Sequence, residues 1–111
     1  METNINFKTD GDVAIHVTDL ERAEKFYSNV LGFKLINKKK DQLVYQTGVL
    51  TLYVNKDSTV IPFIPALEVK DFKKAKEHLI KNGCNITIEF EGSKALYFQD
   101  PFGITIDIVE K

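Results

Sequence analysis

A chain of 111 residues with 43% hydrophobic and 28% charged residues has the length and composition of one small globular domain, residues 1–111. Its net charge of −1 at pH 7 gives no electrostatic reason to expect binding to nucleic acid or to an anionic membrane. No apolar stretch approaches the ~18 residues of a membrane span, nothing at the amino terminus resembles a signal peptide, and the single cysteine fits a reducing compartment, so we expect a cytoplasmic protein.

The first half of the chain begins with residues 12–17, which alternate between two faces as a half-buried strand does. One face carries Val13, Ile15 and Val17, and the other carries Asp12, Ala14 and His16. Thr18 followed by Glu21 predicts a capping box at the start of a helix, and Gly32 is placed to end that helix. Three strand-like runs follow at residues 33–37, 43–47 and 49–55.

The second half repeats this order. A strand is predicted at residues 64–69, a helix from about 72 to 82, and strands at 85–90, 95–99 and 104–109. Shifting the sequence by 52 residues (68 − 16 = 52) places Val17 on Val69, Asp19 on Asp71 and Ala23 on Ala75. The chain is therefore predicted to be an α+β protein of two βαβββ modules, at about residues 12–55 and 62–110. Two such sheets placed edge to edge would form a cup, although periodicity alone does not distinguish this from other α+β arrangements.

Four short segments of the chain, taken in this order along the sequence, resemble motifs of a known protein family. They are Val17-Thr18-Asp19-Leu20-Glu21-Arg22-Ala23, Phe26-Tyr27, Leu31-Gly32-Phe33, and Asp100-Pro101-Phe102-Gly103 with the following Ile106-Asp107-Ile108. Together they resemble the vicinal-oxygen-chelate superfamily, the group of glyoxalases, bleomycin-resistance proteins and extradiol dioxygenases. The resemblance implies a rolled, cup-shaped mixed sheet with helices on its outer face, a small-molecule ligand in the cup and a homodimer.

The resemblance also bears on metal binding. In the metal-dependent members, His and Glu side chains from the first and fourth strands of each module hold a divalent cation, which acts as a Lewis acid. The corresponding positions here are Asp12, Thr51, Ile64 and Asp107. Ile64 has no donor atom and Thr51 is a poor neutral ligand, so we expect no metal cofactor. The alternative is that the two carboxylates hold Mg²⁺ or Mn²⁺ loosely, with waters completing the coordination.

Four further side chains are predicted to face the ligand. His16 and Glu68 occupy matching positions in the two modules, and His16 could act as a base or as a hydrogen-bonding anchor. Tyr53 and Tyr97 could supply aromatic walls, or they could simply pack within the sheets. The set of predicted ligand-binding residues is therefore Asp12, His16, Thr51, Tyr53, Ile64, Glu68, Tyr97 and Asp107.

Three functions remain open at this point. We expect a metal-free, acidic cup that binds a cationic or hydrogen-bond-donating small molecule, as in resistance or sequestration proteins. The alternative is a divalent-metal-dependent lyase, isomerase or dioxygenase of the glyoxalase type, and a third possibility is a regulatory partner without a ligand. Whether the chain is catalytic, and whether its modules pair within one chain or swap between subunits, stays undecided.

Overall fold

The computed structural model describes residues 5–111, which divide into two compact units. The first comprises residues 11–64 and is called here the 11–64 unit. The second comprises residues 65–111 together with the segment before residue 11, and is called here the 65–111 unit. The two longest strands each run across a unit boundary, at residues 10–11 and 64–65.

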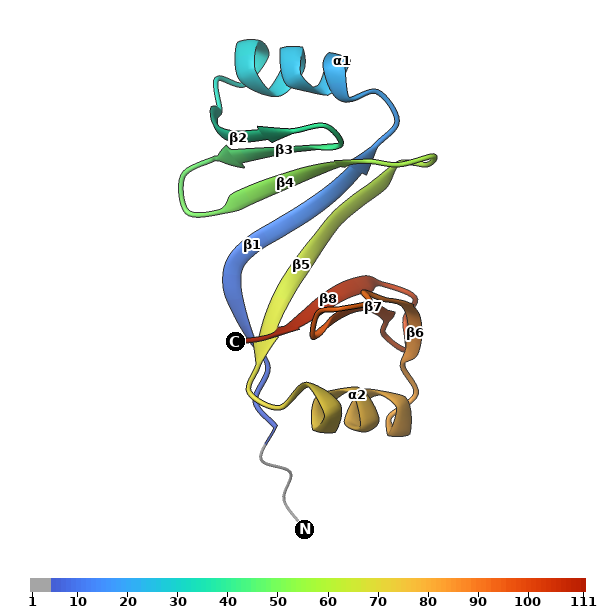
Figure 1. Cartoon of the computed structure of the whole chain (residues 1–111). Helices are drawn as coiled ribbons and strands as arrows, with labels where there is room; N and C mark the ends of the chain where they lie inside the picture. Colours follow the sequence, from blue (N-terminus) through green and yellow to red (C-terminus); the bar gives the residue numbers. More distant parts are fainter. Residues whose placement is uncertain (1–4) are drawn as a thin grey trace. The chain divides into compact units, whose positions relative to one another are not determined.

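The 11–64 unit has the predicted βαβββ order (Figure 1). Its elements are β1 (Lys8–Val17), α1 (Leu20–Lys25), the π-helical segment η1 (Phe26–Val30), β2 (Lys34–Lys39), β3 (Gln42–Gln46) and β4 (Thr51–Lys56). The strands lie in the order β2-β3-β4-β1. β1 runs parallel to β4, and the other neighbours in this order are antiparallel.

The 65–111 unit repeats the module. Its elements are β5 (Ile61–Val69), α2 (Phe72–Lys81), β6 (Asn85–Glu89), β7 (Ala95–Gln99) and β8 (Thr105–Glu110). The strands lie in the order β5-β8-β7-β6, with β5 parallel to β8 and the rest antiparallel. The predicted α+β class and the two βαβββ modules are therefore confirmed.

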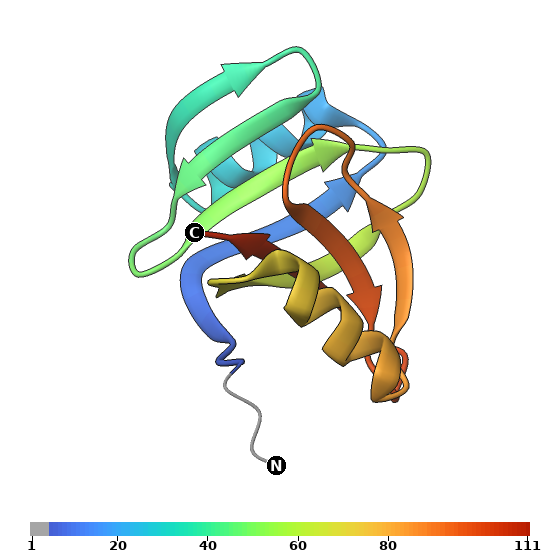
Figure 2. The ribbon, with the colours of Figure 1, turned by 60° about the horizontal axis from the view of Figure 1, so that its bottom comes forward.

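Each unit has a hydrophobic core between its helix and one face of its sheet, and Figure 2 shows α2 lying along its sheet. The buried core of the 11–64 unit consists of Ile15, Ala23, Leu43, Tyr45, Leu52 and Val54. That of the 65–111 unit consists of Val69, Phe72, Ala75, Leu79, Leu96, Phe98 and Ile108. Burying a large apolar side chain contributes about 1.5–3 kcal/mol, so the apolar face of each sheet is held against its helix. Only the opposite face of each sheet is then left for a ligand. Within residues 5–111, no helix is long and apolar enough to cross a membrane.

The start of α1 differs from the prediction. Asp19 is the N-cap residue, and its carboxylate accepts the backbone N–H of Arg22 at 3.0 Å. The predicted capping box of Thr18 and Glu21 is therefore wrong by one residue. The carboxylate of Asp19 reaches the first turn because its backbone is extended there, at φ −131° and ψ 97°.

The end of the first helix is π-helical, which the sequence did not indicate. The N–H of Leu31 donates to the carbonyl of Phe26 at 3.1 Å, a spacing of five residues. Tyr45, which is fully buried, donates its hydroxyl to the carbonyl of Glu24 at 3.4 Å and lies 2.8 Å from the hydroxyl of Ser28. A side chain from β3 thus satisfies a helical carbonyl at the transition into η1, which is a recognised cause of such irregularities.

Candidate functional site

The open face of the 11–64 unit is the face of β1, β4 and β3 that points away from α1. The strand register sets its side chains in three rows, which are Asp12–Thr51–Gln46, Ala14–Tyr53–Val44 and His16–Asn55–Gln42. A carboxylate therefore lies at one end of the face, a tyrosine in the middle and an imidazole at the other end. We call this surface the first open face.

Two hydrogen bonds order the polar row of the first open face. The amide of Gln42 donates to the side-chain oxygen of Asn55 at 2.8 Å. Nδ1 of His16 lies 2.7 Å from a carboxylate oxygen of Asp57, and the side chain of His16 is only 12% exposed. The row therefore presents fixed polar groups at the end of β1 rather than freely rotating ones.

Two hydrogen bonds with the backbone of neighbouring segments hold Asp57 at this position. Its N–H donates to the carbonyl of Val17 at 2.8 Å, and its second carboxylate oxygen accepts the N–H of Ser58 at 2.6 Å. The hydrogen bond with His16, followed by the one from Ser58, lowers the pKa of Asp57 below its ordinary value. The carboxylate is therefore ionised at neutral pH and can only accept hydrogen bonds.

The 65–111 unit has a corresponding face on β5, β8 and β7, which we call the second open face. Its rows are Ala66–Asp107–Tyr97 and Glu68–Val109–Ala95. Tyr97 is buried, and its ring meets that of Phe90 edge-on at a centroid distance of 5.0 Å. One carboxylate oxygen of Asp107 is buried as well. The second open face therefore also combines carboxylates with a tyrosine.

The four positions that the family uses for metal ligands differ in the donor atoms that they offer here. Asp12 and Thr51 are brought together as strand partners, but Asp107 lies beside Ala66, and Ile64 is fully buried with no donor atom. Because Ala66 corresponds to Ala14 in the repeat, the register of Asp107 matches that of Tyr53. Nowhere in the described part of the chain do three His, Cys, Asp or Glu side chains gather as a metal site would require. Of the four side chains, only the carboxylates of Asp12 and Asp107 are good ligands for a divalent cation, and Ile64 offers no donor atom at all.

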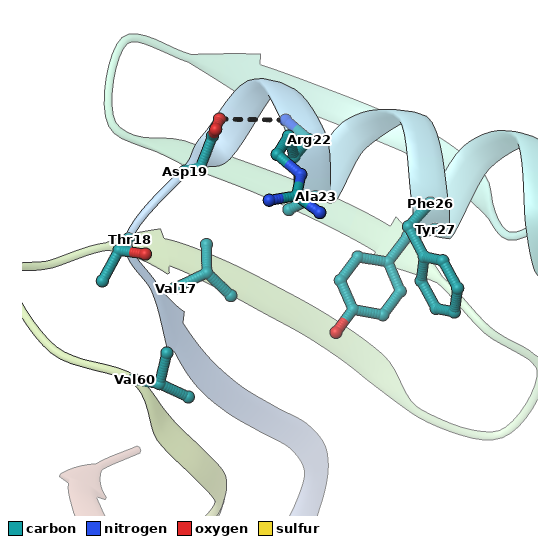
Figure 3. A pocket seen from close by; sticks show the side chains of 8 residues that line it. All are labelled: Val17, Thr18, Asp19, Arg22, Ala23, Phe26, Tyr27 and Val60. Atoms are coloured by element: carbon teal, nitrogen blue, oxygen red, sulfur yellow. Dashed lines mark hydrogen bonds between the residues drawn. The ribbon is translucent and has the colours of Figure 1, made fainter.

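A hollow of about 280 Å³ lies on the other side of the 11–64 unit, beside α1 (Figure 3). Figure 3 shows the side chain of Arg22 and the rings of Phe26 and Tyr27 on the same side of the helix. Its other lining residues are Val17, Thr18, Asp19, Ala23 and Val60. None of the predicted ligand-binding residues lines it, and its volume lies just below the usual range of ligand pockets, so the open faces remain the candidate site.

Sequence reasoning missed the residues that form the two hydrogen bonds of the His16 row, apart from His16 itself. Asn55 continues the alternation of Thr51 and Tyr53 along β4, so the period of two could have identified it. Gln42 becomes part of the row only through the pairing of β3 with β4. Asp57 lies beyond the end of β4 and 41 residues from His16, and no sequence pattern indicates that contact.

The family of the chain follows from a comparison with known families. Residues 11–108 match the model of the Glyoxalase/Bleomycin resistance protein/Dioxygenase superfamily. The chain belongs to this superfamily. The resemblance found in the sequence is thus confirmed, whereas no curated protein sequence matches the chain significantly.

Several solved structures have the same fold as this chain. A variant of homoprotocatechuate 2,3-dioxygenase from Brevibacterium fuscum is 20% identical with a TM-score of 0.71, over 96% of this chain and 33% of that chain. The complex of that enzyme with 3,4-dihydroxyphenylacetate gives a TM-score of 0.72 at 20% identity, over 96% and 37% of the two chains. A hypothetical protein from Bacillus halodurans is 15% identical with a TM-score of 0.71, over 95% and 94%. This superfamily member thus spans about one third of the dioxygenase, and at such identities the likeness extends to the fold alone.

Proposed function

We propose that this member of the superfamily binds a cationic or hydrogen-bond-donating small molecule on its open faces, without a metal ion, in the manner of a resistance or sequestration protein. The observation that carries the proposal is the first open face itself. Along this face, Asp12 offers a carboxyl group that accepts hydrogen bonds, Tyr53 offers an aromatic ring, and His16 offers an imidazole at the far end. A small molecule with an ammonium group and an aromatic body would match this order of groups.

The second open face supports the same class of ligand independently. Glu68 and Asp107 add two carboxylates, and Tyr97 lies beside Asp107 in the strand register. Carboxylate oxygens accept hydrogen bonds and, when ionised, attract cations. Each face taken by itself thus carries at least one carboxyl group, which supports the proposal of an acidic ligand site.

A titration followed by ¹⁵N–¹H NMR tests the proposal. Benzylamine is the cationic probe, and benzyl alcohol and phenylacetate are its neutral and anionic counterparts. Benzylamine is expected to shift amide signals of β1 and β4 in a saturable way, and a basic glycopeptide such as bleomycin is expected to do the same. Binding of phenylacetate in preference to benzylamine would contradict the proposed ligand class.

A matched pair of variants locates the binding. Asp12→Asn removes the charge on the first open face and keeps the shape of the side chain. Asp41→Asn removes the same charge from an exposed position before β3. We expect Asp12→Asn to weaken benzylamine binding severalfold and Asp41→Asn to leave it unchanged. Equal effects of the two substitutions would mean that only the net charge matters and that no site exists on this face.

The alternative function is a metal-dependent lyase, isomerase or dioxygenase, and it is favoured by the fold shared with an extradiol dioxygenase. Elemental analysis of protein purified without chelators discriminates between the two. Stoichiometric metal that disappears in Asp107→Ala would support the alternative, together with turnover of a catechol such as 3,4-dihydroxyphenylacetate. Protein without metal that still binds benzylamine would support the metal-free proposal.

We also propose that the chain forms a homodimer, as its family resemblance implies. Two large apolar side chains, Phe102 and Ile104, precede β8 with exposed fractions of 87% and 55%. Exposed apolar groups that lie close together on a surface are typical of interfaces. Light scattering coupled to gel filtration should give twice the chain mass of 12.7 kDa. Phe102→Ser combined with Ile104→Ser should shift the particle toward the monomer if this surface is the interface.

A further inference from the structure

The hollow beside α1 combines a cationic side chain with two aromatic rings. Arg22, Phe26 and Tyr27 line it from the helix and from η1, while Val17 of β1 and Val60 before β5 also line it (Figure 3). A cavity of about 150 Å³ is enough to hold benzene. A hollow of about 280 Å³ therefore has room for one ring together with a short polar group.

The aromatic wall of this hollow is already ordered by contacts within the chain. The ring of Tyr27 stacks on that of Phe33 with an interplanar angle of 3° and a centroid distance of 6.3 Å. The ring of Phe26 meets that of Tyr27 edge-on, at a centroid distance of 5.4 Å. Phe26 is nevertheless 47% exposed, so it still offers apolar surface to a ligand. Because these rings are held in place beforehand, a ligand that covers them loses less affinity to side-chain ordering.

Arg22 supplies a positive charge to the same hollow. Figure 3 shows its guanidinium below the helix, whereas the carboxylate of Asp19 is turned toward the start of the helix. One oxygen of that carboxylate accepts the backbone N–H of Arg22 as the helix cap. Within residues 5–111, the guanidinium of Arg22 forms no ion pair with an Asp or Glu side chain. A guanidinium only donates hydrogen bonds, and its planar fork matches the two oxygens of a carboxylate.

We propose that the hollow beside α1 is a second binding site, which takes a small carboxylate with an aromatic or branched apolar body. The guanidinium of Arg22 holds the carboxylate, and Phe26 and Val60 cover the apolar part. The hollow shares no lining residue with the first open face, and its charge selects the opposite class of ligand. The site therefore goes beyond the proposed function and does not depend on it.

A ¹⁵N–¹H NMR titration with 3-phenylpropanoate tests the site. We expect saturable shifts of the amide signals of Arg22, Phe26 and Tyr27. The control is 3-phenylpropylamine, which has the same ring and the opposite charge and should leave these three signals in place. The signals of Tyr53 and Asn55 on β4 report on the first open face separately, so failure of one proposal is distinguished from failure of the other. Equal saturable shifts of the α1 signals by the amine, or no shift by the carboxylate, would overturn the second site.

A matched pair of variants tests the role of Arg22. Arg22→Gln removes the charge at the hollow, and Lys25→Gln removes the same charge from an exposed position of α1 that does not line it. We expect Arg22→Gln to weaken the binding of 3-phenylpropanoate roughly tenfold, as the loss of a hydrogen bond to a charged group does, and Lys25→Gln to leave it unchanged. Equal losses in the two variants would mean that only the net charge of the helix matters, and the proposed site would then be wrong.

Two further variants keep the proposal testable if Arg22→Gln does not fold. Arg22→Lys keeps the charge but loses the planar fork, so binding should still weaken severalfold. Phe26→Leu removes the ring and keeps an apolar side chain, and it should weaken 3-phenylpropanoate more than the branched aliphatic 4-methylpentanoate. Unchanged binding of 3-phenylpropanoate in both folded variants would show that neither side chain contacts the ligand and would contradict the proposal.

Discussion

Asp19 and Asp71 cap the two helices of the chain in the same way, 52 residues apart (71 − 19 = 52). Each carboxylate accepts the backbone N–H of the residue three positions later, at 3.0 Å in both cases. The backbone angles are nearly equal as well, with φ of −131° and −128°. The repeat is thus preserved down to a single hydrogen bond, which supports the sequence alignment of the two modules.

Removing either cap should destabilise the protein by about 1 kcal/mol, because one orphan N–H of the helix loses its acceptor. The variants are Asp19→Ala and Asp71→Ala, and the free energy of unfolding is measured by urea denaturation. Thr18→Ala is the control, since Thr18 would matter only if the predicted capping box existed. A larger loss in Thr18→Ala than in Asp19→Ala would contradict the observed cap.

The η1 segment gives the second prediction. Tyr45→Phe removes the hydroxyl that serves the carbonyl of Glu24 and the side chain of Ser28, and nothing else in the buried ring changes. We expect a loss of about 1–2 kcal/mol in the free energy of unfolding, because buried polar groups are left without their partner. A double-mutant cycle with Ser28→Ala measures the direct coupling, and a coupling near zero would mean that Ser28 contributes nothing to this bond.

The comparison of sequence and structure shows what local patterns can predict. The alternation at residues 12–17 predicted both the strand and its two faces, because Ile15 is buried against α1 while Asp12 and His16 lie opposite. The π-helical turn was not predictable, because it depends on Tyr45 from a strand that follows later in the chain. The same holds for Asp57, whose partner is 41 residues away. Residue types predicted the faces, whereas the register between strands decided which side chains meet.

Acidification should weaken the contact between β8 and α2. Glu110 accepts the backbone N–H of Phe72 at 2.9 Å and pairs with Lys94, and the bond from Phe72 is the main cause that lowers the pKa of Glu110 below its ordinary 4.5. A lowered carboxyl pKa means that the native state binds its proton less readily than the unfolded state. The stabilisation is therefore complete above pH 4.5 and is lost as the pH falls through the lower native pKa.

Urea denaturation between pH 7 and pH 3 tests whether the free energy of unfolding falls on acidification as expected. The wild-type chain should lose more stability over that range than Glu110→Gln, whose amide can still accept from Phe72 but does not titrate. Glu91→Gln, at an exposed glutamate, is the matched control and should follow the wild-type curve. A Glu110→Gln variant that is as acid-sensitive as the wild type would assign the pH dependence to other groups.

Metal removal gives the last prediction. Because Ile64 supplies no donor and Asp107 lies beside Ala66 rather than beside Ile64, we expect no tight divalent site. Chelation by EDTA should leave Tm unchanged, and so should millimolar Mg²⁺ or Mn²⁺, whereas a ligand at 100 times its Kd stabilises a native state by ~2.7 kcal/mol. Thermal unfolding with and without each ion is the measurement. A rise of Tm with Mn²⁺ concentration that Asp12→Asn abolishes would contradict the metal-free proposal and would favour the loose carboxylate site instead.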